Sequence, residues 1–126
     1  MTTSFCATDQ RYAGGRGFQM NFLNGYSLSV QWGKHNYCDN RQLGSDSLPA
    51  IIPMSCQNAE LMIAYGDEGI GYDRFPEPLT KWKSHFDTFG IASFMSPDDV
   101  AMLLSDIASM PGSAVPLPYV DQEMSE

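Results

Sequence analysis

Residues 17–32 read GFQMNFLNGYSLSVQW, and this stretch decides the fold. Apolar and polar residues alternate on both sides of the central Asn24-Gly25 pair, which is typical of two strands joined by a tight turn. A three-residue loop at 23–25 would pair Phe22 with Tyr26 and place every apolar side chain on one face. A two-residue turn would put the two apolar rows on opposite faces. We therefore predict a β-hairpin with one apolar face and with Gly25 in the left-handed conformation.

The other face of this hairpin is polar but carries no charge. Its side chains are those of Gln19, Asn21, Ser27, Ser29 and Gln31. A face of hydroxyl and amide groups can lie against water or against a partner, and the pattern leaves both alternatives open.

Two strands and a helix are expected further along the chain. Residues 59–65 alternate between apolar and polar side chains, and residues 89–95 (FGIASFM) form a second β-rich stretch. Ser96 is a good helix N-cap, Pro97 suits the first helical position, and apolar residues then recur at helical spacing as far as Met110. We predict an α+β fold, with an antiparallel sheet of about four strands built on the hairpin and one C-terminal amphipathic helix packed on it.

The remaining segments lack a clear period. We expect residues 1–16 to be a flexible N-terminal arm, residues 17–111 to form a single domain, and residues 112–126 to be an acidic, Pro-containing, disordered tail. Residues 72–85 contain two prolines and no period, so we expect a surface loop with aromatic anchors and at most a short helical turn.

Charge and composition exclude several classes of partner. The net charge is −8: residues 1–45 hold four Lys or Arg against two Asp or Glu, and the remainder holds three against thirteen. Duplex nucleic acid is not expected as a partner, because phosphate binding needs a clustered basic surface. No window approaches the ~20 apolar residues of a membrane span, and no secretory signal is evident, so we expect a soluble cytoplasmic protein. Three cysteines suit free thiols in a reducing compartment.

The loop after the hairpin, residues 33–44 (GKHNYCDNRQLG), is the best candidate for a binding site. It holds a dense mixture of side-chain chemistry directly after a strand. The candidate binding residues are Trp32, Lys34, His35, Asn36, Tyr37 and Arg41. Aromatic faces can stack on a base while cations hold a phosphate, which favours a small anion or nucleotide as ligand. Alternatively, the amides bond the loop's own backbone and the aromatic residues anchor it to the core.

A metal or thiol site is a further alternative in the same region. The candidate metal ligands are His35, Cys38, Cys56 and His85. Structural zinc sites usually show two closely spaced ligand pairs, and here only His35 and Cys38 are close in sequence. Cys38 could instead serve as the nucleophile of a small enzyme with His35 as its base. We expect neither a cofactor nor catalysis.

The segment from Arg16 to Arg41 resembles a group of short proteins encoded by tailed phages and prophages. The shared pattern is GF..NF.NGY.LSVQWG..NYCDNR, and the strand at 59–64 and the helix start at 96–100 match the order of elements in that group. The resemblance implies a phage-encoded accessory protein in the host cytoplasm, which binds a host or phage protein and acts as a non-enzymatic inhibitor, for example of a host defence protein. It brings no catalytic residues with it. Assembly into a homo-oligomer stays open.

Overall fold

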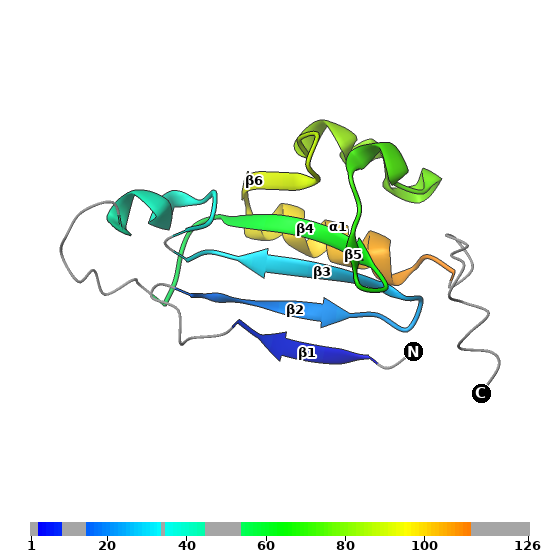
Figure 1. The fold of residues 1–126 in the computed structure, drawn as a ribbon, viewed down its shortest axis with the longest axis horizontal. Helices are drawn as coiled ribbons and strands as arrows, with labels where there is room; N and C mark the ends of the chain where they lie inside the picture. The colour runs from blue at the N-terminus through cyan, green and yellow to red at the C-terminus, as the bar shows by residue number, and fades with distance from the viewer. Residues whose placement is uncertain (1–2, 9–14, 34, 45–53, 112–126) are drawn as a thin grey trace.

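In the part of the chain that the structure describes, an antiparallel β-sheet has one α-helix packed on it (Figure 1). The computed structural model describes residues 3–8, 15–33, 35–44 and 54–111 of the 126. The strands are β1 (Ser4–Ala7), β2 (Gly17–Asn21), β3 (Tyr26–Gln31), β4 (Ala59–Tyr65), β5 (Glu68–Gly69) and β6 (Ile91–Met95). They lie in the order β1-β2-β3-β4-β5, and β6 also pairs with β4. The α+β class and the C-terminal helix are confirmed, whereas the described residues form a sheet of six strands rather than about four.

The N-terminal strand β1 corrects one expectation. We expected residues 1–16 to form a flexible arm, but Ser4–Ala7 pair with β2 in an antiparallel ladder. Four residues are too short for an alternation of apolar and polar side chains to be recognised in the sequence. The predicted tail, residues 112–126, lies outside the described residues.

The hairpin of β2 and β3 has the predicted register. Met20 lies opposite Leu28, and the backbone N–H of Phe22 donates to the carbonyl of Tyr26 at 2.8 Å. Gly25 has φ +92°, so it occupies the left-handed region that a side chain would resist. The three-residue loop and the shared apolar face are therefore confirmed.

Asn24 in the hairpin loop holds the end of the helix. Its Nδ2 donates to the carbonyl oxygens of Ile107 at 2.7 Å and Met110 at 2.9 Å, and its Oδ1 accepts from the N–H of Tyr26 at 3.1 Å. The last carbonyls of a helix have no partner within the helix, so an outside donor stabilises them. The hairpin turn is thereby joined to a segment more than eighty residues away.

The α-helix, α1 (Pro97–Ala108), begins as the sequence predicts. The Ser96 hydroxyl accepts from the N–H of Asp99 at 3.2 Å, and Pro97 occupies the first turn. The helix ends at Ala108, two residues before the predicted end, and the chain then bonds to Asn24. Its buried residues, Val100, Leu103 and Ile107, face the sheet.

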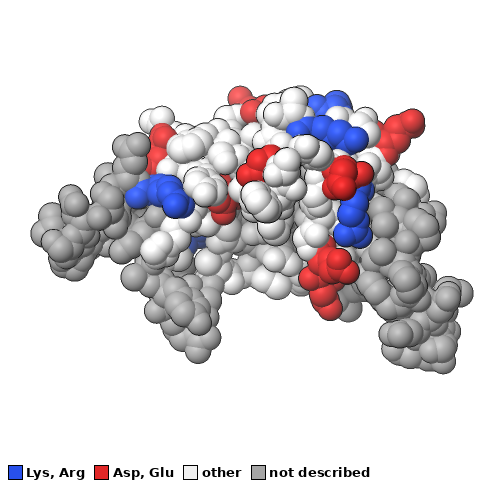
Figure 2. Space-filling model, turned by 45° about the horizontal axis from the view of Figure 1, so that its top comes forward, with Lys and Arg blue, Asp and Glu red and all other residues white. Residues whose placement is uncertain are grey.

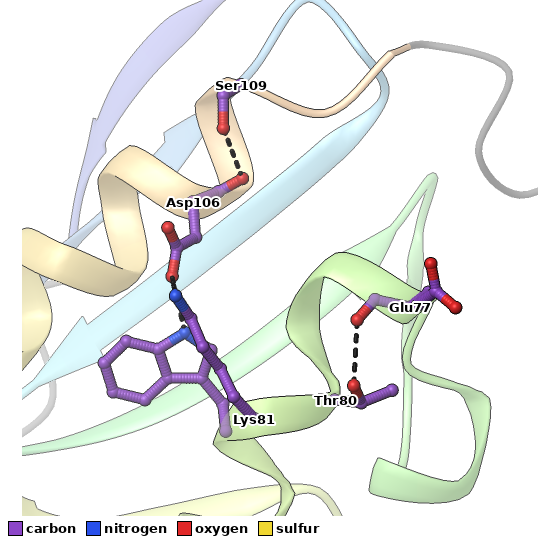
Figure 3. Close-up of polar contacts among 6 residues, drawn as sticks. Glu77, Thr80, Lys81, Asp106 and Ser109 are labelled. Carbon is purple, nitrogen blue, oxygen red and sulfur yellow. Dashed lines mark hydrogen bonds and ion pairs between the residues drawn. The ribbon is translucent and has the colours of Figure 1, made fainter.

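Three 3₁₀-helices complete the described structure: η1 (Asp39–Gly44), η2 (Tyr72–Arg74) and η3 (Glu77–His85). The nine-residue η3 replaces much of the expected surface loop, and it buries Leu79 and Trp82. The indole Nε1 of Trp82 donates to Asp106 at 2.8 Å, and Lys81 lies 3.1 Å from the same carboxylate. Figure 3 shows Lys81 reaching from η3 toward Asp106 on α1, so this polar junction fastens the two helices together.

The two faces of the sheet differ in what covers them. Figure 1 shows α1 behind the sheet. The apolar residues of β3 and β4, among them Leu28, Leu61 and Ile63, are fully buried and share one core cluster with the buried residues of α1. The front face of β1 to β4 carries no helix in the described part of the chain. None of the described helices is long and apolar enough to cross a membrane.

Candidate functional site

Glu60 on β4 holds the loop that follows β3. Asn36 donates from Nδ2 to Glu60 Oε1 at 3.0 Å, and its Oδ1 accepts from the N–H of Gly33 at 2.8 Å. The other carboxylate oxygen of Glu60 accepts from the N–H of Tyr37 at 3.0 Å. The amide of Asn36 is therefore engaged in shaping the loop rather than offered to a ligand.

The far end of the loop is tied to the segment that leads into β4. Asn40, which is buried, donates from Nδ2 to the carbonyl oxygens of Trp32 at 2.8 Å and Ser55 at 3.3 Å. The N–H of Asp39 donates to Asn58 Oδ1 at 2.8 Å. The side-chain amides of Asn36 and Asn40 thus bond the backbone of the loop and its neighbours, which agrees with the alternative prediction that the amides shape the loop.

Cys38 is a buried free thiol. Its side chain is fully inaccessible, and its Sγ lies 3.5 Å from the carbonyl of Gly33. Burial, together with the neighbouring Cys56 thiol, raises the pKa of this thiol to about 11, although hydrogen bonds from the backbone of Asn40 and Arg41 act to lower it. A thiol in this state is a poor nucleophile, because thiolate is the reactive form.

The four candidate metal ligands do not form a metal site. His35 is exposed on the loop, whereas His85 lies on η3 with its ring 5.3 Å from that of Trp82. Only Cys38 and Cys56 interact with each other. Within the described ranges, no group of three or more His, Cys, Asp or Glu side chains could hold a metal ion.

An exposed side-chain pair, Tyr37 and Arg41, lies next to the backbone of Phe94. The Arg41 guanidinium lies over the Tyr37 ring, 4.4 Å from its centroid, and Arg41 Nη1 donates to the carbonyl of His35 at 2.9 Å. The N–H of Phe94 in β6 donates to the carbonyl of Tyr37 at 3.0 Å. Tyr37 and Phe94 are 44% and 53% exposed. We name Tyr37, Arg41 and Phe94 the Tyr37 patch.

Phe94 was not among the residues singled out from the sequence. It has φ +54°, which makes it the only described residue other than glycine with a positive φ. A bulge in the pairing of β6 with β4, between Ala59 and Leu61, accompanies this conformation. The left-handed region costs a bulky residue about 1–2 kcal/mol. The adjacent apolar pair Phe94-Met95, which interrupts the alternation of the strand, was the one available signal.

Trp32 lies against an apolar cavity. Its ring meets Phe18 edge to face at 6.2 Å, and its Nε1 donates to the carbonyl of Met54 at 2.9 Å. The cavity has a volume of about 440 Å³ and lies beside the N-terminal half of α1, with Ala101 and Leu104 in its wall. A more polar hollow of about 510 Å³, lined in part by Asp39 and Asn40, shares Ser55 and Cys56 with it.

Few of the described residues predicted to hold an anion line these two hollows. Of Trp32, His35, Tyr37 and Arg41, only Trp32 lines either of these two hollows. Lys34 lies outside the described residues. The guanidinium of Arg41 is stacked on the ring of Tyr37, so these two candidate binding residues contact each other on an exposed surface.

The polar hairpin face is bonded within itself. Gln19 donates to Asn21 at 2.9 Å, Gln31 donates to the Ser29 hydroxyl at 3.1 Å, and the Thr8 hydroxyl donates to Gln31 at 2.7 Å. These side chains satisfy one another along the front of the sheet.

No protein-family model matches the chain, and no curated protein or solved structure is significantly similar to it.

Proposed function

We propose that this protein acts by binding another protein and that the Tyr37 patch is the contact surface. The observation that carries the proposal is the exposed Phe94, which is held at φ +54° and whose backbone N–H bonds to the carbonyl of Tyr37, the residue on which Arg41 stacks. Strained backbone persists where the surrounding structure imposes it, and it is concentrated at functional sites. Tyrosine, phenylalanine and arginine are enriched at protein–protein interfaces, where tyrosine and arginine often dominate the binding energy.

The resemblance to phage proteins extends this proposal. We propose that the partner is a host protein, for instance one of a defence system, and that binding inhibits it without catalysis in the host cytoplasm. The burial of Cys38 supports a non-enzymatic mode, since a protonated thiol does not serve as a nucleophile. No described cation lines the polar hollow, and Asp39 does, which disfavours an anionic ligand there.

The charge distribution favours a protein over duplex nucleic acid. Figure 2 shows acidic and basic side chains interspersed on one face, with a broad uncharged area between them. Duplex binding needs basic side chains clustered along a groove or stripe. The Tyr37 patch combines two exposed aromatic side chains with a single described cation, which is better suited to contacts with another protein than to a phosphate backbone.

The test is capture of the partner with matched variants. The protein is immobilised, the host protein that it retains is identified, and its affinity is measured for Tyr37→Ala, for Arg41→Ala and for Phe89→Ala. Phe89 is the control because it is 82% exposed and lies outside the patch. We expect the two patch variants to lose at least tenfold in affinity and to reduce inhibition of the partner in proportion, while Phe89→Ala changes neither. Equal affinities for all the variants would move the contact surface elsewhere.

A further inference from the structure

Among the described residues, no strand pairs with the outer edge of β1. β1 ends the strand order, and all four of its residues are exposed. The N–H of Thr8 donates to the carbonyl of Gly17 at 3.1 Å, and the ladder places Cys6 opposite Gln19. Because hydrogen-bonded and non-bonded pairs alternate in an antiparallel ladder, Ser4, Cys6 and Thr8 bond to β2. The N–H and C=O groups of Phe5 and Ala7 consequently point outward.

The next ladder confirms this alternation independently. Phe22 and Arg16 bond to β3 through Tyr26 and Trp32. Phe18 and Met20 therefore also face β3, which leaves the backbone groups of the intervening residues 17, 19 and 21 to face β1. Both ladders give the same assignment.

This edge lacks the usual protection against pairing. Natural edge strands carry charges, prolines or bulges that block another strand. The sequence of β1 is SFCA and that of β2 is GFQMN, so neither strand has a charged residue or a proline. The phenyl ring of Phe5 is 78% exposed on the face that holds Met20 and Phe18.

We propose that a second copy of this chain pairs with β1 through its own β1, antiparallel and about a two-fold axis. When Phe5 of one copy lies opposite Ala7 of the other, every outward-facing N–H and C=O group of β1 forms a hydrogen bond with the other copy. Each copy then contributes two donors and two acceptors, and the two sheets become one. Cys6 of one copy faces Cys6 of the other at the axis.

The side chains at this junction favour a second copy as the occupant. In the proposed register, Phe5 of one copy lies between its own Met20 and Ala7 of the other, so the partly exposed apolar row continues across the axis. The absence of charge on β1 and β2 matters because the chain carries a net charge of −8, and two copies would otherwise repel each other at the contact.

Cys6 allows a direct test of the register. Residues of a non-hydrogen-bonded antiparallel pair have Cα atoms about 4.5 Å apart, within the range of about 4.4–6.8 Å that a disulfide requires. Diamide treatment should join two copies, as two thiols lose two protons and two electrons to the diamide and form one Cys6–Cys6 bond. The matched control is Ser4→Cys in a Cys6→Ser background, because the two introduced thiols would lie about 13 Å apart along the strands.

Light scattering of the full chain during size exclusion supplies the second readout. We expect twice the 14.0 kDa chain mass without oxidant, and at least tenfold weaker dimerisation for Phe5→Lys. Leu23→Lys is the control, since Leu23 is 73% exposed on the hairpin turn, and it should leave the dimer intact. A monomeric mass at all concentrations would overturn the proposal, as would a dimer unaffected by Phe5→Lys or cross-linking through Ser4→Cys as efficient as that through Cys6.

Discussion

Replacement of Asn24 by alanine should destabilise the fold by about 2–3 kcal/mol. The substitution removes two bonds to the carbonyl oxygens of Ile107 and Met110 and one from the N–H of Tyr26. A typical hydrogen bond contributes about 0.5–1.5 kcal/mol, and a buried group left unpaired costs about 1–3 kcal/mol. The carbonyl of Ile107 keeps a bond from the N–H of Met110, so the loss falls mainly on Met110 and Tyr26.

Urea denaturation at pH 7 measures this loss as a change in the free energy of unfolding. Leu23→Ala is the neighbouring control, because that side chain is exposed and should change the free energy by less than about 0.5 kcal/mol. Asn24→Asp should be at least as harmful as alanine at pH 7, since it sets a carboxylate against two carbonyl oxygens. The reasoning would be refuted if Asn24→Ala cost less than about 1 kcal/mol.

Three further substitutions test the fold. Gly25→Val should cost more than ~1 kcal/mol, because φ is +92° at that position; an unchanged denaturation curve would contradict the turn assignment. Tyr26→Phe should stabilise the fold by about 1 kcal/mol, because the buried hydroxyl has no hydrogen-bond partner among the described residues and burial raises its pKa to about 12. A loss of stability would mean that the hydroxyl is hydrogen-bonded. The hydrogen bond from Trp82 holds the pKa of Asp106 below its usual value, so the stability that this carboxylate adds is present above pH ~4 and is lost as the pH falls. Asp106→Asn should therefore flatten the acid side of the curve of unfolding free energy against pH. A curve identical to that of the wild type would contradict this assignment.

Local patterns predicted the elements whose signals lie within one segment. The hairpin register, the strand at 59–65 and the N-cap at Ser96 all follow from spacing and turn chemistry. The strand β1 and the helix η3 were missed because one is four residues long and the other contains Pro78 and has no apolar period.

The candidate site could be predicted only in part from the sequence, for a different reason. The composition of the loop marks it as a candidate site, but whether one of its side chains shapes the loop or contacts a partner depends on residues distant in sequence. Asn36 is bonded to Glu60, twenty-four residues away. Phe94 joins Tyr37 through a backbone bond that spans fifty-seven residues, and no pattern within β6 specifies it.

The Phe94→Asn variant tests the proposed binding function most directly. Asparagine tolerates the left-handed region, so relief of strain offsets the packing lost from this half-exposed ring, and the free energy of unfolding should stay within about 1 kcal/mol of the wild type. The measurement is titration calorimetry of this variant against the captured partner. The account predicts at least a tenfold loss of affinity with the fold preserved. Undiminished affinity in a folded Phe94→Asn protein would contradict it.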